Sequence, residues 1–158
     1  MTREILFRGK RVNNGEWVEG YYSPVNIPIT GNMGHFINVG GYRAVEIDPD
    51  TVGQFTGLTD KNGAKIFEGD ILACHNNPKD IYKVVLGEFN VIDTETFEIV
   101  ENVVGWHTEV IPTADPLSAV EPFNLPMPLN KFYLERSEMV VIGNIYDNPE
   151  LLEVSESD

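Results

Sequence analysis

The sequence predicts a mainly β protein in which short antiparallel strands form a barrel or sandwich, with a short C-terminal helix. Runs of β-branched and aromatic residues, turn residues at short intervals and the lack of a sustained heptad indicate this fold class. The 158 residues are 42% hydrophobic and 10% aromatic, which suits one folded domain over residues 1–158. Within that domain, residues 1–50 are a candidate N-terminal β subdomain.

The first third of the chain is predicted to hold a hairpin, a loop and two more strands. β-forming residues over residues 5–22 flank Asn14-Gly15, a pair that can supply the positive φ angles of a tight turn. Prolines and glycines over residues 23–42 indicate a loop with one short strand around His35–Val39. Two further strands are expected at Ala44–Ile47 and Gly53–Leu58, on either side of a turn at Asp48-Pro49-Asp50.

The stretch TDKNGAKIFEGDIL (residues 59–72) places Asp60, Glu68 and Asp70 around two glycines. A calcium loop of the EF-hand type needs a glutamate at its twelfth position, and counting from Asp60 puts Ile71 there. The order Asp60-Lys61-Asn62-Gly63 is instead typical of a type I turn closed by a left-handed glycine. We therefore expect this turn, a strand over Lys65–Phe67, a second turn over residues 68–70 and a strand over Ile71–Cys74.

The second half of the chain is predicted to contain three strands, a long loop and the C-terminal helix. β-branched and aromatic residues indicate strands over Ile81–Ile92 and Phe97–Trp106. Five prolines over residues 112–128 predict a loop with one helical turn near Leu117–Glu121, because proline lacks the amide donor that helices and sheets need. A buried strand over Met139–Tyr146 and a helix over Pro149–Val154, capped by Asn148, are expected to follow.

The net charge of −14 is unevenly distributed along the chain. Residues 1–79 hold 8 Lys/Arg and 9 Asp/Glu, a net −1, whereas residues 80–158 hold 3 Lys/Arg and 16 Asp/Glu, a net −13. Nucleic-acid binding needs cations that displace the counterions on phosphate, so this balance argues against a direct nucleic-acid partner. The acidic half is either a solubilising surface or one that attracts a basic partner.

The common catalytic and metal-binding patterns do not select an active site, so no catalytic residue, metal or cofactor is expected. Cys74 and His75 are adjacent, and neighbouring side chains of a strand point to opposite faces, so the two could not act as a pair. The sequence has no Gly-x-Ser-x-Gly elbow, phosphate loop or zinc-ligand spacing. Among the aromatic residues, Trp17 and Trp106 are the candidate contact residues, because tryptophan is favoured at interfaces.

The sequence favours a bacterial or viral protein that works in a reducing cytoplasm. Its apolar runs are too short to span a membrane, and the N-terminus has no apolar signal core, so no membrane partner is expected. The single cysteine, Cys74, cannot form an internal disulfide, which fits a reducing compartment.

Three stretches of the chain closely resemble the YopX-type proteins of bacteriophages and prophages: FRGKRVNNGEWVEGYY (7–22), VGQFTGLTDKNGAKIFEGDIL (52–72) and VIGNIYDNPELL (141–152). Residues 76–138 match that family only in general character. The resemblance implies a small cytoplasmic protein that forms homo-oligomers and has no established activity. The positions that it marks coincide with predicted turn and cap residues, namely Gly57, Leu58, Asp60, Gly63, Glu68, Gly69, Asp70, Gly143, Asn144, Asn148 and Pro149.

These features favour a non-enzymatic phage or prophage accessory protein that acts by contacting other proteins, its own copies included. One alternative is an acidic decoy that imitates DNA and occupies a nucleic-acid-binding protein. Another is a hydrolase that uses Glu68 and Asp70, with or without a metal. A further option is peptide binding through residues 54–74, which resemble part of an SH3-like barrel, although a fold alone does not define a function.

Overall fold

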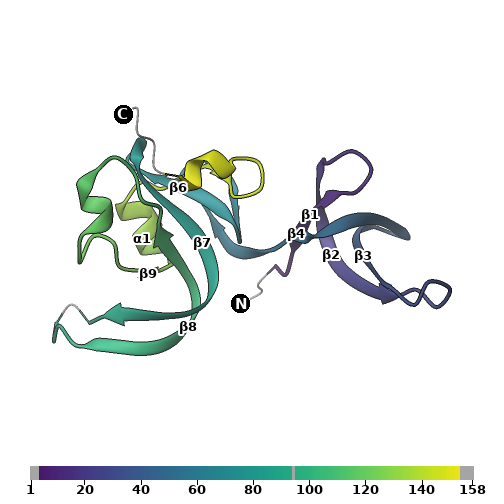
Figure 1. The fold of residues 1–158 in the computed structure, drawn as a ribbon, viewed down its shortest axis with the longest axis horizontal. Helices are drawn as coiled ribbons and strands as arrows, with labels where there is room; N and C mark the ends of the chain where they lie inside the picture. Colours follow the sequence, from purple (N-terminus) through teal and green to yellow (C-terminus); the bar gives the residue numbers. More distant parts are fainter. Residues whose placement is uncertain (1–3, 94, 154–158) are drawn as a thin grey trace. The chain divides into compact units, whose positions relative to one another are not determined.

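The fold is mainly β, as the sequence predicts, in a computed structural model that describes residues 4–93 and 95–153. The strands pair antiparallel in two five-stranded sheets. The chain divides into two compact units, residues 1–57 and residues 58–158, and strand β4 (Arg43–Thr59) runs from the first unit into the second. Figure 1 shows the strands of both units.

The first sheet has the strand order β1–β2–β3–β4–β5, and β1 also pairs with β4. The four N-terminal strands therefore form a closed ring of pairings. The buried side chains of this unit include Ile37, Ile47 and Phe55, which are at most 7% exposed. Besides β4, the strands of this sheet are β1 (Phe7–Arg11), β2 (Trp17–Asn26), β3 (Met33–Gly40) and β5 (Lys65–Phe67).

The N-terminal hairpin of β1 and β2 forms as predicted, but its turn is not the tight one that was expected. Of the pair Asn14-Gly15, only Gly15 has a positive φ, at 72°. Gly15 N donates to Arg11 O at 2.9 Å and Arg11 N donates to Glu16 O at 2.8 Å, so the loop is longer than two residues. The pair marks the position of the turn but not its type, because a type I′ turn needs a positive φ at both central residues.

The strand expected around His35–Val39 is confirmed within β3, but the loop expected in the rest of residues 23–42 was wrong, because β2 and β3 form a second hairpin there. β2 continues to Asn26 and pairs with β3 in a register that places Pro24 opposite His35. β1 pairs with β2 only from Trp17 to Gly20, so beyond that point one side of β2 has no neighbour in β1. A proline, which cannot donate to a sheet ladder, is tolerated on such an open side.

The turn expected at Asp48-Pro49-Asp50 lies inside the single long strand β4 and does not separate two strands. It forms an irregularity in the pairing with β1, where Arg8 lies opposite Gly53 and Lys10 lies opposite Asp48. Thr51 Oγ1 donates to Asp48 O at 2.7 Å and accepts from Lys10 N at 2.9 Å. The hydroxyl thus links the extra residues of β4 to β1, so the strand continues through them.

The second sheet belongs to the second unit and has the strand order β10–β6–β7–β8–β9. Every residue of β6 is buried because successive side chains enter two different core clusters. Leu72 and Cys74 belong to one cluster, and Ile71 and Ala73 belong to the other. The strands are β6 (Asp70–Cys74), β7 (Asn77–Ile92), β8 (Ile99–Val110), β9 (Met127–Pro128) and β10 (Val140–Asn144).

The helix α1 (Lys131–Arg136) lies in a segment for which the sequence analysis predicted no element. Asn130 caps it, because its Oδ1 accepts from Tyr133 N at 2.8 Å. Tyr133 and Leu134 are buried in the same core cluster as Leu72, so packing stabilises a helix that would be too short to persist alone. No helix in the described part of the chain has the length and apolarity that crossing a bilayer requires.

The proline-rich segment, residues 112–128, is mostly irregular, as expected. A 3-10 helix, η1 (Pro116–Ala119), begins one residue before the predicted helical turn, with Asp115 Oδ1 accepting from Leu117 N at 3.0 Å. The segment ends in β9, which pairs with His107 and Thr108 of β8.

The predicted C-terminal helix is the 3-10 helix η2 (Pro149–Leu152), and Val154, its expected end, lies outside the described residues. The predicted side-chain cap was wrong, because Asn148 Oδ1 accepts from Asn144 N at 3.1 Å instead of from η2. Gly143 leaves room for this contact. A Cβ atom at Gly143 would lie 2.3 Å from Asn148 Oδ1, which is well inside van der Waals contact.

We predict that Gly143→Ala lowers the free energy of unfolding by about 1–3 kcal/mol, because the added methyl group displaces the Asn148 side chain. Gly87→Ala in β7 is the matched control, since a Cβ there has no heavy atom within 4 Å. The control should change stability by less than about 0.5 kcal/mol. Urea denaturation of both variants measures the difference, and equal losses would contradict the assigned contact.

Candidate interaction surface

The carboxylate of Asp60 is buried and accepts hydrogen bonds from three backbone N–H groups. Oδ1 accepts from Asn62 N at 2.8 Å and from Ala64 N at 2.9 Å, within the turn that begins at Asp60. Oδ2 accepts from Val141 N of β10 at 3.0 Å. Gly63 N donates to Asp60 O at 3.0 Å and closes the turn. The side chain is 7% exposed, so its oxygens are engaged by the backbone and face little solvent.

The second acidic turn is also bonded into the second sheet. Asp70 is 1% exposed, and its Oδ2 accepts from Phe67 N at 2.8 Å. Gly69 N donates to Val84 O and Gly69 O accepts from Ile145 N, both at 2.9 Å. The structure therefore brings residues 59–72 and 141–152 together, at Asp60 with Val141 and at Gly69 with Ile145. Gly57, Gly63 and Gly69 all have φ angles between 82° and 88°.

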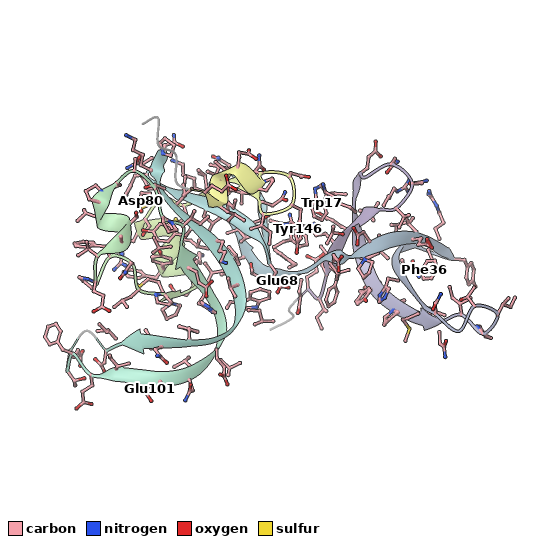
Figure 2. All side chains as sticks on the ribbon, viewed as in Figure 1. Trp17, Phe36, Glu68, Asp80, Glu101 and Tyr146 are labelled. Atoms are coloured by element: carbon pink, nitrogen blue, oxygen red, sulfur yellow. The ribbon has the colours of Figure 1, made fainter. Side chains whose placement is uncertain are left out.

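Glu68 is the acid of this stretch that lines a pocket. The pocket has a volume of about 150 Å³, and Lys83 and Tyr146 also line it. Figure 2 shows Glu68 and Tyr146 in the second unit. Asp70 does not line this pocket, so Glu68 and Asp70 do not form a carboxylate pair in it.

The loop between β10 and η2 is held by asparagine side chains. Asn144 is 8% exposed, and its Oδ1 accepts from Tyr146 N at 3.0 Å and from Asp147 N at 2.9 Å. Pro149 occupies the first turn of η2, where the missing N–H would have no partner in any case. These side chains shape the local backbone by hydrogen bonding to it.

Cys74 is buried at the end of β6, with an exposed fraction of 9%. Burial, and after it the carboxylate of Asp80, raises the pKa of the Cys74 thiol from 9.0 to about 11. Asp80 Oδ1 also accepts from the Tyr82 hydroxyl at 2.6 Å, and burial is the main cause of a raised Tyr82 pKa. His75 follows in a turn, where its Nδ1 lies 3.0 Å from Glu138 Oε2. The Cys74 thiol is therefore protonated at neutral pH and a poor nucleophile.

The two candidate contact tryptophans lie in different units and are both half-buried. The ring of Trp17 has the Arg8 guanidinium 4.5 Å and the Lys10 ammonium 5.4 Å from its centroid. Trp106 packs against the core cluster that contains Leu72. Their role as contact residues stays a prediction. Within residues 4–93 and 95–153, no group of three or more His, Cys, Asp or Glu side chains is placed to hold a metal ion.

An apolar groove, which the sequence analysis did not predict, lies between the end of β7, the proline-rich segment and α1. Its volume is about 350 Å³. The guanidinium of Arg136 lies 5.4 Å from the centroid of the Phe132 ring and brings a positive charge to the groove. Phe132 is 68% exposed, so an apolar ring faces solvent here. The lining includes Ile92, Leu125, Met127, Phe132 and Arg136.

The strands beside the groove continue as a two-stranded ribbon over residues 86–104, the β7–β8 arm. Figure 1 shows β7 and β8 extending together beyond the rest of their sheet, and Figure 2 shows Glu101 on this arm. Exposed apolar residues on it include Phe97 at 81%, Ile99 at 62% and Val104 at 71%. Large exposed apolar patches mark interaction sites in many soluble proteins. The groove and the arm together form the candidate interaction surface.

We predict that Asp60→Ala lowers the free energy of unfolding by about 2–4 kcal/mol, because it leaves buried N–H groups without an acceptor. Asp93→Ala is the matched control. Asp93 makes a similar local turn, with Oδ1 accepting from Glu95 N at 2.9 Å, but it is exposed. We expect the control to lose less than about 1 kcal/mol. If urea denaturation gave equal losses, the bond to Val141 would not stabilise the fold.

We predict that stability falls more steeply between pH 9 and pH 11 in the wild type than in Cys74→Ala. Because its pKa is raised to about 11 on folding, the thiol holds its proton more tightly in the folded state. The thiol contributes about 1–3 kcal/mol to the free energy of unfolding. This contribution is complete below the pKa of the thiol in the unfolded chain, and it is lost as pH rises towards the pKa in the folded protein. Tyr82 is present in both proteins, and Cys74 is the smallest of the causes that raise the pKa of Tyr82. Parallel urea titrations across this range measure the slopes, and identical slopes would refute the assignment.

Comparison with known proteins gives one family match. A family model described as YopX protein matches residues 6–153. Among solved structures, the crystal structure of protein EF1440 from Enterococcus faecalis is 25% identical in sequence. The match covers 96% of this chain and 100% of that chain, with a TM-score of 0.45. No curated protein matches the sequence. Since the family model spans nearly all of the described residues, the chain belongs to the YopX family.

Proposed function

We propose that this YopX-family protein is a non-enzymatic phage or prophage accessory protein that binds other proteins in the cytoplasm of a bacterial host. The observation that carries the proposal is the apolar groove beside the exposed side chains of the β7–β8 arm. Solvent-facing apolar rings such as Phe132 lower the free energy when a partner covers them. Self-association stays a prediction, which sedimentation of the purified chain tests.

The burial and the hydrogen bonds of the acids in residues 59–72 support a binding protein over a hydrolase. Asp60 and Asp70 are buried and accept backbone N–H bonds, which is the geometry of turn residues. A general acid or base must instead reach a substrate proton within hydrogen-bonding distance. Glu68 lines a pocket of only about 150 Å³, which is smaller than the usual ligand site. A hydrolase at Glu68 and Asp70 is therefore the weaker proposal.

An acidic decoy is a second candidate, which a different observation favours. Residues 84–130 contain no Lys or Arg but eight Asp or Glu, at positions 88, 93, 95, 98, 101, 109, 115 and 121. A run of carboxylates without cations resembles a phosphate backbone in charge. A protein that normally binds DNA would then be the partner, and its binding would weaken steeply with salt.

We predict that Phe132→Ser removes at least one partner that the wild-type protein captures from extracts of bacterial cells. Loss of one well-placed aromatic contact should weaken binding by about fivefold or more. Ile29→Ser is the matched control, because Ile29 is 96% exposed and lies outside the groove. Quantitative mass spectrometry of the captured proteins measures the effect. If all three baits retained the same proteins, the groove would have no part in binding.

A further inference from the structure

The β7–β8 arm has open backbone edges. β9 pairs with β8 only at His107 and Thr108, and Leu129 N donates to Trp106 O at 3.0 Å. No other described strand pairs with the side of β8 that faces away from β7 between Ile99 and Gly105. The N–H and C=O groups on this side of β8 form a template on which another strand can pair.

Exposed apolar side chains lie on both faces of β8 in the arm, although Phe89 of β7 is buried against His107. Ile99 and Val100 are neighbours on one strand, so their side chains point to opposite faces, yet they are 62% and 46% exposed. Val104 is 71% exposed farther along the same strand. An isolated two-stranded ribbon is marginally stable in water, and a third strand would stabilise it. The edge and the faces therefore both favour an added strand.

The charge of the arm restricts which strand can be added. It has five acids and no Lys or Arg, and all five acids are exposed. A second copy of the arm would bring five more negative charges beside them, and like charges on paired strands are unfavourable. A strand that carries Lys or Arg would instead find opposite charges across the new pairing. The acids are Glu88, Asp93, Glu95, Glu98 and Glu101.

Strand β8 has a bulge at Asn102, the residue after Glu101. Asn102 has a φ of 58°, and its N–H donates to Asn90 Oδ1 at 3.1 Å. The register shifts here, so that Phe89 lies opposite Val103 whereas Val91 lies opposite Val100. Charged residues on an edge strand discourage pairing with a strand of like charge. They leave pairing with a chain of opposite charge open.

We propose that the outer edge of β8, from Ile99 to Gly105, binds an extended segment of a basic protein as an added β-strand. Backbone hydrogen bonds would provide the register. Lysine or arginine side chains of the partner would lie near Glu98 and Glu101, and its apolar side chains would cover Ile99 and Val104. This inference rests on the proposed protein-binding function and assigns it a surface and a class of partner.

Three fluorescent peptides of equal length, with alternating Lys-Val, Glu-Val and Lys-Ser, test the proposal by anisotropy with the full-length protein. The Lys-Val peptide should bind at low ionic strength and weaken at least about tenfold at ~0.2 M salt, because screening shortens the reach of the charges. The Glu-Val peptide should not bind. The Lys-Ser peptide should bind at least about fivefold more weakly than Lys-Val, because it cannot cover the apolar side chains.

Two charge variants and one apolar variant, each a double substitution, locate the binding on the arm. Glu98→Gln/Glu101→Gln should weaken Lys-Val binding about fivefold or more, since it removes two of the attracting charges. Glu150→Gln/Glu153→Gln removes the same charge from exposed residues of the same unit outside the arm, and it should change binding less than about twofold. Thermal melts of both variants verify that they fold. Ile99→Ser/Val104→Ser should weaken Lys-Val binding but not Lys-Ser binding.

Several results would overturn the proposal. They are failure of the Lys-Val peptide to bind, equal binding of the Glu-Val peptide, and equal losses for the two charge variants. An arm-dependent dimer in sedimentation would assign the edge to a second copy instead. The Phe132→Ser capture experiment is independent of these peptides. If Phe132→Ser lost a captured partner but the peptides did not bind, the protein-binding function would be supported. Only the proposal of a basic strand as the partner would then be refuted.

Discussion

The second unit depends on the buried carboxylate of Asp60, which joins two segments far apart in sequence. Its two oxygens bind the turn at Asn62 and Ala64 and the backbone of Val141 in β10. Water cannot replace these bonds readily at a site that is 7% exposed, so the three N–H groups depend on this side chain. The contact of Gly69 O with Ile145 N adds a second tie between the same segments.

The acids of this chain serve two different purposes. Those of the YopX-like stretch 59–72 include two buried carboxylates, Asp60 and Asp70, that accept from the backbone and specify turns. Those of the β7–β8 arm face solvent, beside exposed apolar side chains. The net charge of −14 counts the buried and the exposed acids alike. Their burial separates acids that shape the fold from acids that are available to a partner.

Sequence alone predicts the features whose bonds are local. The turn Asp60–Gly63 depends on its own side chains and Gly63, and its residue order is sufficient to place it. The strand at Pro24 and the helix that buries Tyr133 depend on distant neighbours, so local composition gave a loop or no element. The side chain of Asn148 could accept either from the helix that follows it or from Asn144 N, and the sequence does not distinguish the two. Ile99 belongs to a run of β-branched residues. Such a run predicts a strand but does not indicate whether its side chains are buried or exposed.

Residues 84–130, which include the arm and contain no Lys or Arg, also determine where proteases can cut the protein. Trypsin cuts after lysine or arginine, and none occurs between Lys83 and Lys131. An exposed hairpin is normally an early cleavage site, yet trypsin has no bond to cut in this one. Resistance of this region to trypsin would therefore report its composition and not its rigidity. A protease that cuts after glutamate would find substrates at Glu98, just before the open strand, and at Glu101 within it.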